Sequence, residues 1–414
     1  MTECGFNTAL LHSAASDDPQ GATLTPIYQC SAFQHKNAEE LEQIFANRKP
    51  GFSYTRINNP TVQAFERRMT QLEGGVTSVA CASGMGALTI SLMNLLQSGD
   101  EVVAAAGLYG GTVELFNMLE AFGIHTHYVL RNTPGDFEKQ ITDRTRVLFA
   151  ETIGNPRLDV TDIHGVADVA HRHSVPLIID NTVATAYLVQ PLKLGADIVV
   201  NSSSKYINGN SDAISGVITC ASRFHWDAEH YPGMKPFAKF GNMAYAVKLR
   251  NTFFPAMGAC LSPQNAFLNN LGLETLGLRM ERQCANALAL AHCLNSMDGI
   301  TVNYPGLPTS AYHDLAQRQF QGGFGAIITL RTGSRARAFQ ILDALTLPSI
   351  VSNIGDTKTL VIHPASTIAV HLDQAEQQAA GIYEDMIRIS VGIEDIEDLT
   401  RDFQRAVKGA EPYE

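Results

Sequence analysis

The segment Asn201-Ser202-Ser203-Ser204-Lys205 holds the residues with the clearest chemical potential in this chain. It closes the β-rich run 197–201, so the lysine is expected directly after a buried strand, behind three hydroxyl groups. An amine in a desolvated cleft can stay neutral and attack an aldehyde, and serine hydroxyls can donate hydrogen bonds to a phosphate. The alternative is a solvated lysine that follows a serine-rich turn.

A second segment, Ser83-Gly84-Met85-Gly86, joins a β-rich run at 78–82 to a helical pattern at 86–96. Glycine lets backbone N–H groups approach a phosphate at a helix N-terminus, where the helix dipole favours anions. A dinucleotide site would need a third glycine where Thr89 stands, so a single phosphate fits better. A plain turn between a strand and a helix is the alternative.

A third residue, Asp180, ends the apolar run 176–180. A carboxylate at the end of a buried strand is costly unless it is paired. A protonated pyridine nitrogen is a suitable partner, because the ion pair keeps the ring able to accept electrons from a carbanion. Capping of the following turn is the alternative. Together with the phosphate turn, Asp180 predicts a pyridoxal 5′-phosphate site with the cofactor held as a Schiff base on Lys205.

These residues need a sheet that brings strand ends to one edge. The chain alternates between short apolar runs and helical patterns, which predicts an α/β fold with a mainly parallel sheet covered on both faces by helices. Ligands bind such sheets beyond the carboxyl ends of the strands. The expected strands are 78–82, 101–105, 146–151, 176–180 and 197–201, and the expected helices are 86–96, 112–122 and 163–173.

Three parts of the chain differ in their residue pattern. Residues 1–58 are rich in turn formers and predict an extended arm, residues 59–257 a large domain, and residues 258–414 a smaller α/β domain. In the last part, Ser262 and Pro263 fit the start of a long helix that continues through 271–297. Further expected elements there are a strand at 325–330, a helix at 335–345, a strand at 386–391 and a helix from Glu394.

The composition restricts the partners and the compartment. The net charge of −11 argues against a nucleic acid or an anionic membrane as the main partner. No apolar stretch approaches the ~20 residues that span a bilayer, and residues 1–20 lack the pattern of a secretory signal. Seven scattered cysteines without a C-x-x-C motif predict buried thiols in a reducing cytoplasm. Two pairs of histidines lie close in the sequence, His125/His127 and His171/His173, but neither has a cysteine or carboxylate at metal-ligand spacing. No metal site is therefore expected.

With these segments taken together, the chain resembles the Cys/Met-metabolism family of pyridoxal-phosphate enzymes over nearly its whole length. The resemblance implies the type I fold of PLP-dependent transferases (aspartate-aminotransferase-like), with a mostly parallel large domain and a smaller C-terminal α/β domain. Tyr54-Thr55-Arg56, followed by Asn59-Pro60-Thr61, resembles the family arm that enters a neighbouring subunit and binds its cofactor phosphate. It therefore implies a homo-oligomer, usually a dimer of dimers.

The resemblance also implies roles for single residues. Gly84 and Met85 match the backbone phosphate donors, Ser202 and Ser204 the side-chain donors, and Tyr109 the residue that stacks on the pyridine ring. Without the resemblance to the family, Arg388 of the expected strand 386–391 could equally form a structural ion pair. Further matches are Asn155, which contacts the ring oxygen, and the substrate-binding residues Ser352, Asn353 and Arg388, of which Arg388 binds the α-carboxylate.

The expected reaction follows from finer similarities. The loop 353–360 and the segment 272–281 resemble O-acetylhomoserine sulfhydrylases, and Gly111 stands where methionine γ-lyases usually carry a cysteine. The resemblance thus implies that sulfide or a thiol replaces the acyl group of an O-acylhomoserine, giving homocysteine or methionine. Lys205, Tyr109 and Tyr54 are the expected proton-transfer residues.

Two positions depart from the pattern of the family. Asn210 replaces the usual histidine of cystathionine enzymes, and Ile368-Ala369 replaces a common Thr-His. Elimination by a methionine or cystathionine γ-lyase therefore stays an alternative, as does cystathionine γ-synthase activity. An NAD-dependent oxidoreductase that uses the turn at 83–86 is the alternative from a different class of enzyme.

Overall fold

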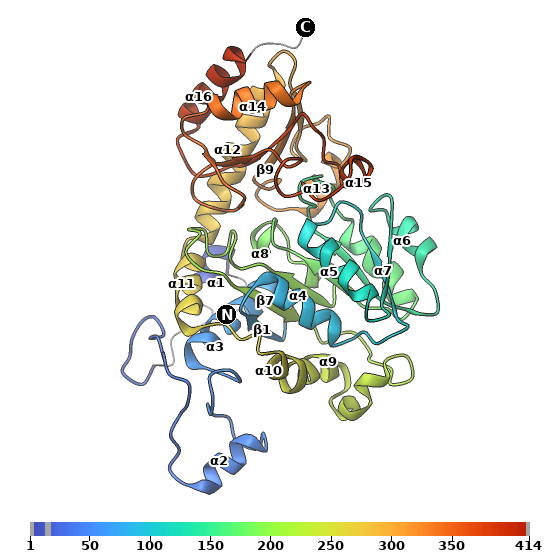
Figure 1. Cartoon of the computed structure of the whole chain (residues 1–414). Helices are drawn as coiled ribbons and strands as arrows, with labels where there is room; N and C mark the ends of the chain where they lie inside the picture. Colours follow the sequence, from blue (N-terminus) through green and yellow to red (C-terminus); the bar gives the residue numbers. More distant parts are fainter. Residues whose placement is uncertain (1–3, 13–17, 411–414) are drawn as a thin grey trace.

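The computed structural model describes residues 4–12 and 18–410, so parts of the expected arm and of the expected small domain (1–3, 13–17 and 411–414) lie outside the described residues. Figure 1 shows a central sheet with its helices, a second sheet at the C-terminal end of the molecule, and an N-terminal segment that projects from the opposite end.

The central sheet has seven strands in the order β1-β7-β6-β5-β4-β2-β3. Six of them run in the same direction, whereas β7 runs antiparallel to both of its neighbours, because it follows β6 through a loop without a crossover helix. The predicted mainly parallel sheet is confirmed, and each predicted strand lies within one residue of its expected bounds. The strands are β1 (Thr77–Cys81), β2 (Glu101–Ala104), β3 (His125–Tyr128), β4 (Thr145–Glu151), β5 (Leu177–Asp180), β6 (Ile198–Asn201) and β7 (Gly216–Cys220).

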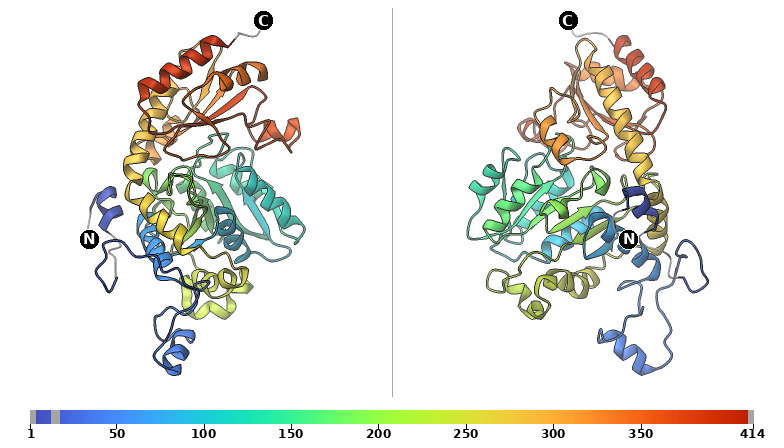
Figure 2. Two further views of the ribbon diagram at one scale, coloured as in Figure 1. Left: turned by 60° about the vertical axis from the view of Figure 1, so that its left-hand side comes forward. Right: turned by 180° about the vertical axis from the view of Figure 1, so that it is seen from behind.

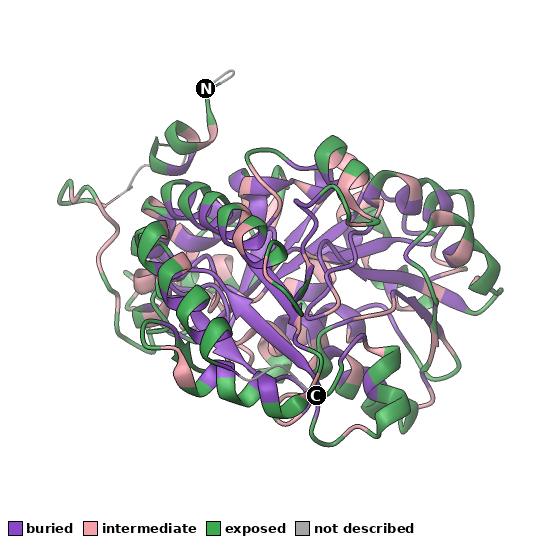
Figure 3. Ribbon diagram, turned by 90° about the horizontal axis from the view of Figure 1, so that it is seen from above, coloured by how far each residue is buried: buried purple, intermediate pink, exposed green. Residues whose placement is uncertain are grey.

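Every residue of β2, β6 and β7 is buried, so the sheet is covered on both of its faces. Figure 3 shows the buried strands in the interior and the exposed residues on the outer sides of the helices. The helices of this part are α3 (Pro60–Glu73), α4 (Gly84–Met93), α5 (Gly110–Glu120), α6 (Pro134–Gln140), α7 (Ile163–Arg172), α8 (Thr185–Leu188), η1 (Pro191–Leu194), η2 (Pro232–Met243), α9 (Ala244–Lys248), η3 (Leu249–Phe253) and α10 (Phe254–Met257).

The second sheet has five strands in the order β10-β11-β12-β9-β8 and is mainly antiparallel. The predicted helix start is confirmed, since Ser262 accepts a hydrogen bond from the backbone of Asn265 and Pro263 begins the helix. The long helical stretch is two helices that meet at Thr275. The elements are α11 (Pro263–Glu274), α12 (Leu276–Asn295), β8 (Thr301–Asn303), α13 (His313–Gln319), β9 (Ile327–Arg331), α14 (Arg335–Ala344), β10 (Ser349–Ile350), β11 (Leu360–Ile362), α15 (Gln374–Ala379), β12 (Met386–Ser390) and α16 (Ile396–Gly409).

The N-terminal segment is less extended than predicted, because it contains two helices. In α1 (Phe6–His12), Leu10 is buried and the helix packs against α3 and α11. In α2 (Ala38–Phe45), Asn37 caps the first turn, and no residue is buried. Figures 1 and 2 show that α2 projects away from the rest of the chain.

Two further expectations concern cysteines and membranes. All seven cysteines are free, but only Cys81, Cys220 and Cys284 are buried. The prediction of buried thiols was wrong for Cys4 and Cys30, which lie exposed on the N-terminal segment. Within residues 4–12 and 18–410, no helix combines the length and the apolar character that a membrane span requires.

A buried carboxyl group joins the ends of two central strands. Glu73, at the end of α3, is fully buried and accepts hydrogen bonds from the side chains of Asn201 (2.8 Å) and Asn181 (3.3 Å). Burial raises the pKa of Glu73 to about 7, against the opposing effect of these two amides. Because Asn181 follows Asp180 and Asn201 precedes Ser202, Glu73 supports the sheet edge at which the predicted site residues lie.

We expect Glu73→Gln to remove part of the pH dependence of stability. A carboxyl group whose pKa rises on folding stabilises the folded state at low pH, and this contribution is lost as the pH rises through about 7. The rise from 4.5 to about 7 corresponds to about 3 kcal/mol. The loss in unfolding free energy between pH 5 and pH 7.5, measured with urea, should therefore be smaller in the variant. The exposed Glu229→Gln is the control, and equal losses in Glu73→Gln and wild type would contradict the assignment.

Candidate active site

A cavity of about 420 Å³ lies where the carboxyl ends of the central strands face the second sheet. The central sheet supplies its phosphate-binding turn and its lysine, whereas the second sheet supplies an arginine and a loop. The predicted site residues that line this cavity are Gly84, Met85, Tyr109, Asn155, Asp180, Ser202, Ser204, Lys205, Ser352, Asn353 and Arg388.

The turn before α4 has the shape of a small anion cradle. Ser83 caps the helix through a hydrogen bond from the backbone of Gly86 (2.9 Å). A Cβ atom at Gly84 would lie 2.6 Å from the Cβ of Ser202, so only glycine allows this close approach. The hydroxyl of Ser204 donates a hydrogen bond to the carbonyl of Ser215 (3.0 Å). Its proton is therefore already used in a hydrogen bond within the protein. Backbone N–H groups and Ser202 are thus better placed as phosphate donors than Ser204 is.

Two carboxyl groups lie side by side at the strand ends. Glu151 and Asp180 are partners in the register of the parallel strands β4 and β5, and both line the cavity. Asp180 accepts a hydrogen bond from the backbone of Thr182 (2.9 Å), so it caps the turn as well. No ion pair of either carboxylate is found in the described part of the chain. Such a pair favours a cationic ligand, for which a protonated ring nitrogen at Asp180 is suitable.

Glu151 was not among the predicted site residues, although it ends a buried strand as Asp180 does. It accepts a hydrogen bond from the backbone of Tyr109 (2.6 Å). Burial and the neighbouring Asp180 raise the pKa of Glu151 well above its usual value, and burial also raises the pKa of Asp180. The ring of Tyr109 lies close to Gly111, where a Cβ atom would come within 2.7 Å of it. This position of the ring therefore depends on glycine at 111.

Lys205 is held inside the cavity. Its Nζ donates a hydrogen bond to Oδ1 of Asn353. Burial, together with the nearby positive charge of Arg388, lowers the pKa of Lys205. This is the environment that a nucleophilic amine needs, because a larger share of the amine is neutral. The alternative of a solvated lysine does not agree with this geometry.

Arg388, on β12, is 3% exposed and has no carboxylate partner within the described residues. It donates to the side-chain oxygen of Asn155 (3.3 Å) and to the backbone oxygen of Asn353 (3.1 Å), and its Nε has no partner there. Burial lowers the pKa of Arg388 to about 10. The alternative of a structural ion pair is therefore not what the structure shows. A buried guanidinium at a cavity wall is suited to bind a carboxylate of a ligand.

Tyr54 and Arg56 do not lie among the residues that line this cavity. Both are exposed, the guanidinium of Arg56 lies 5.4 Å from the centre of the Tyr54 ring, and Nη1 of Arg56 donates to the backbone oxygen of Pro255. Sequence reasoning did not assign several further lining residues to the site, although some of them, such as Ile354 in the loop 353–360, lie within segments that resemble the family. Among them are Thr112, Thr182, Ser211, Ile214 and Ile354.

The cavity thus combines an anion cradle, a pair of carboxyl groups, an amine of lowered pKa and a buried guanidinium. These groups fit a cofactor that has a phosphate, a protonated ring nitrogen and an aldehyde, together with a substrate that has a carboxylate. The observation that supports this fit is that neither Asp180 nor Arg388 forms an ion pair with another described residue. A dinucleotide would leave the lysine and the two carboxyl groups without a use.

Comparisons with known proteins agree with this reading of the cavity. Residues 7–408 match the family described as Cys/Met metabolism PLP-dependent enzyme. The O-acetyl-L-homoserine sulfhydrylase of Corynebacterium glutamicum is 40% identical, over 97% of this chain and 96% of that protein. The homocysteine synthase of Schizosaccharomyces pombe is 38% identical, over 98% of both proteins.

A solved structure is similar over the whole fold. It is assigned to an O-acetylhomoserine (thiol)-lyase of Campylobacter jejuni, and it contains N′-pyridoxyl-lysine-5′-monophosphate. It is 34% identical and has a TM-score of 0.93, over 98% of this chain and 100% of that one. The fold and the pyridoxal phosphate dependence that the sequence predicted are therefore confirmed, and the chain belongs to the Cys/Met-metabolism family of PLP-dependent enzymes.

Proposed function

We propose that this enzyme exchanges the acetyl ester of O-acetylhomoserine for a sulfur group. Sulfide then gives homocysteine and acetate, and methanethiol gives methionine and acetate. The relatives named O-acetyl-L-homoserine sulfhydrylase and homocysteine synthase, each similar over nearly the whole chain, support the choice of reaction. The observation that carries the proposal is the placement in one cavity of Lys205 and of Arg388, which forms no ion pair with another described residue.

The cofactor would be held by groups that already line the cavity. When bound, pyridoxal phosphate supplies an electron-accepting ring that weakens the bonds at the α-carbon of an amino acid. Asp180 would pair with the ring nitrogen, and Lys205 would bind the aldehyde carbon. The remaining contacts would come from the backbone of Gly84 and Met85, the hydroxyl of Ser202 and, with its proton redirected, Ser204, the ring of Tyr109 and the amide of Asn155.

The protein residues then position the substrate and move its protons. Arg388 would bind the α-carboxylate through two parallel hydrogen bonds, beside Ser352 and Asn353. Lys205, whose pKa is lowered, would take the proton from the α-carbon and return protons to neighbouring carbon atoms. Tyr109 and a Tyr54 from a second subunit are further candidates for proton transfer.

The charges of the cavity support a small, uncharged acyl group and nucleophile. Among the described residues of its lining, Lys205 and Arg388 are the cationic side chains. With Lys205 acting at the cofactor and the α-carbon and Arg388 at the α-carboxylate, the described lining offers no further cation to a second carboxylate. Apolar Ile214, Ile354 and Ile368 complete the wall. An acetyl ester with sulfide or methanethiol therefore fits better than a succinyl ester, cysteine or cystathionine.

We expect Lys205→Ala to lose the absorbance near ~420 nm of the lysine-bound cofactor, and at least ~10³-fold of the activity. The exposed Lys139→Ala is the control and should keep both. The assay compares O-acetyl-, O-succinyl- and O-phosphohomoserine, methionine and cystathionine, each with and without sulfide, methanethiol or cysteine. Release of 2-oxobutyrate from methionine or cystathionine, without a replacement product, would instead support a γ-lyase.

We further propose that residues 1–58 act as an arm that completes the site of a second subunit, with residues 59–257 and 258–414 as the large and small domains. The exposed Tyr54 and Arg56, and the unpacked helix α2, support this arrangement. The active unit would then be a dimer, and a dimer of dimers would follow the habit of the family. Free and partly exposed cysteines support a cytoplasmic location.

We expect coexpressed Arg56→Ala and Lys205→Ala subunits, each nearly inactive alone, to recover about a quarter of wild-type activity. Half of randomly formed dimers are mixed, and one of the two sites in each mixed dimer then has both residues. The matched control is Lys205→Ala with Arg388→Ala, which alter the same cavity of one chain and should not recover. Recovery in the control, or none in the test pair, would contradict the shared site.

A further inference from the structure

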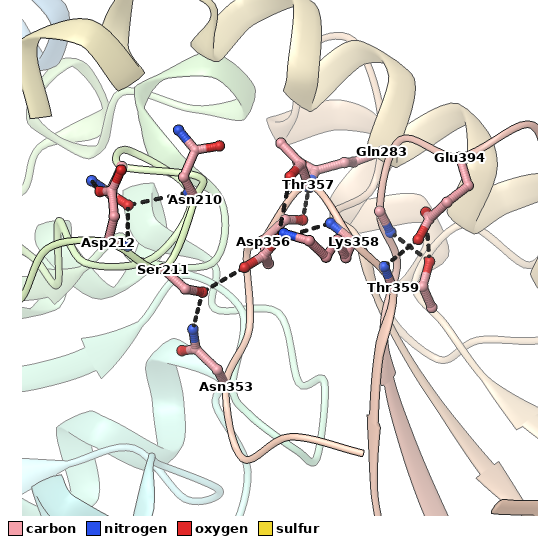
Figure 4. A network of polar contacts seen from close by, with 12 residues as sticks. Asn210, Ser211, Asp212, Gln283, Asn353, Asp356, Thr357, Lys358, Thr359 and Glu394 are labelled. Atoms are coloured by element: carbon pink, nitrogen blue, oxygen red, sulfur yellow. Dashed lines mark hydrogen bonds and ion pairs between the residues drawn. The ribbon is translucent and has the colours of Figure 1, made fainter. Parts of the chain in front are cut away.

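The loop of residues 352–357 is joined to the loop of residues 208–212 by hydrogen bonds at the cavity wall. Asp356, which is 5% exposed, accepts a hydrogen bond from the hydroxyl of Ser211 (2.5 Å) through Oδ2. Its Oδ1 accepts from the backbone of Lys358 (2.9 Å) and from the hydroxyl of Thr357 (3.2 Å). Ser211 in turn accepts from Nδ2 of Asn353 (2.8 Å). Figure 4 shows Ser211 between Asn353 and Asp356.

Further hydrogen bonds fix the backbone at both ends of this series, at Asp356 and at Asn353. The backbone of Thr357 donates to the carbonyl of Gly209 (2.9 Å), and the side chain of Gln283 donates to the carbonyl of Asp356 (2.7 Å). The backbone oxygen of Asn353 accepts from Arg388. These contacts place the backbone of Asn353, but they leave its side-chain amide free to turn.

The protons decide which way that amide turns. Burial alone would raise the pKa of Asp356, but hydrogen bonds from Ser211 and the backbone of Lys358, with the charge of Lys358, lower it. The ionised Asp356 can only accept, so the single hydroxyl proton of Ser211 must point toward it. Ser211 can then only accept from Asn353, which turns the amide nitrogen toward Ser211 and the amide oxygen toward Lys205.

We propose that Asp356 and Ser211 are positioning residues that hold the side-chain oxygen of Asn353 toward the nitrogen of Lys205. The opposite orientation would set two acceptors against each other at Ser211, and an N–H group against the lysine. The proposal rests on the role of Lys205 in the proposed function. It gives a positioning role to Ser211 and Asp356, which lie 145 residues apart in the sequence.

The test is a pH titration of the absorbance near ~420 nm of the lysine-bound cofactor in the holoenzyme. In Asp356→Asn, the amide oxygen keeps the hydrogen bond from the backbone of Lys358, and the new N–H₂ group faces Ser211. Ser211 then donates to Asn353 and turns its amide nitrogen toward Lys205. Because an acceptor stabilises the protonated lysine nitrogen, we expect the midpoint to fall by roughly one pH unit.

Three further variants separate this effect from the loss of one charge. Ser211→Ala changes no charge and should lower the midpoint by a smaller amount, because the amide of Asn353 is then free to turn. Lys358→Met removes an exposed partner of Asp356 but leaves the bond to Ser211, and should leave the midpoint unchanged. In an Asn353→Ala background, Asp356→Asn should lose most of its effect. Arg388, Asp180, Glu151 and Tyr109, which also line the cavity, stay the same throughout.

The outcomes separate this inference from the proposed function. A wild-type protein that forms no borohydride-reducible absorbance would contradict the proposed role of Lys205. If the wild-type absorbance is normal, unchanged titration midpoints in both Asp356→Asn and Ser211→Ala would overturn the proposed positioning of Asn353. An equal shift with and without Asn353 would also overturn it, because it would show a through-space effect of charge. Thermal melting checks that each variant is folded, and Ser211→Ala decides the case if Asp356→Asn is destabilised.

Discussion

The central constraint in this molecule is that ionisable groups are buried around one cavity and have no ion-pair partner within the described chain. Lys205 and Arg388 carry positive charge, and Asp180 and Glu151 can carry negative charge. Desolvation lowers the pKa values of the two bases and raises those of the two acids, so burial disfavours the charged form of each group. Such an arrangement costs stability, and bound charges of opposite sign offset that cost. In the proposed function, a cofactor with a cationic ring and a substrate with a carboxylate would supply those charges.

The rest of the fold brings these groups together and keeps them apart from water. The parallel strands bring Glu151, Asp180 and Lys205 to one edge of the central sheet. The buried Glu73 links two of the strand ends by accepting hydrogen bonds from Asn181 and Asn201. The antiparallel second sheet supplies Arg388 from across the cavity. Lys205 thus comes from the central sheet and Arg388 from the second sheet. The site depends on the contact between the two sheets as much as on either one.

Between the two sheets, a short series of hydrogen bonds determines the orientation of the Asn353 side chain. A carboxylate that cannot donate, a hydroxyl with one proton and an amide with distinct ends leave one consistent assignment of protons from Asp356 to Lys205. Ser211 belongs to the central part of the chain and Asp356 to the C-terminal part, so the same contacts also join the two parts at the cavity wall. The loop that departs from the family pattern at Asn210 therefore supplies a neighbouring residue to the site.

Local sequence patterns were sufficient for much of the fold. Mostly apolar runs of five or six residues predicted five central strands, because strands that are covered on both faces are mainly apolar. The exposed edge strand β3, with the residues His-Thr-His-Tyr, has no such run and was missed. β7 was missed as well, although Gly-Val-Ile-Thr-Cys is such a run, and its antiparallel place between β1 and β6 has no local signal. The helices of the N-terminal segment were also not predicted, although Asn37 is a good cap.

The sequence by itself determined the type of chemistry, because the lysine, the phosphate turn and the carboxylate each follow a strand that ends at the same edge of the sheet. It also left alternatives for Asp180 and Arg388, since a side chain alone does not reveal its partner. Only the tertiary structure decided that Arg388 has no carboxylate partner within the described chain, that Glu151 lines the cavity beside Asp180, and that Ser211 lies in hydrogen-bond contact with both Asp356 and Asn353. The physical reason is that burial and hydrogen bonding depend on residues far apart in the chain, which no local pattern records.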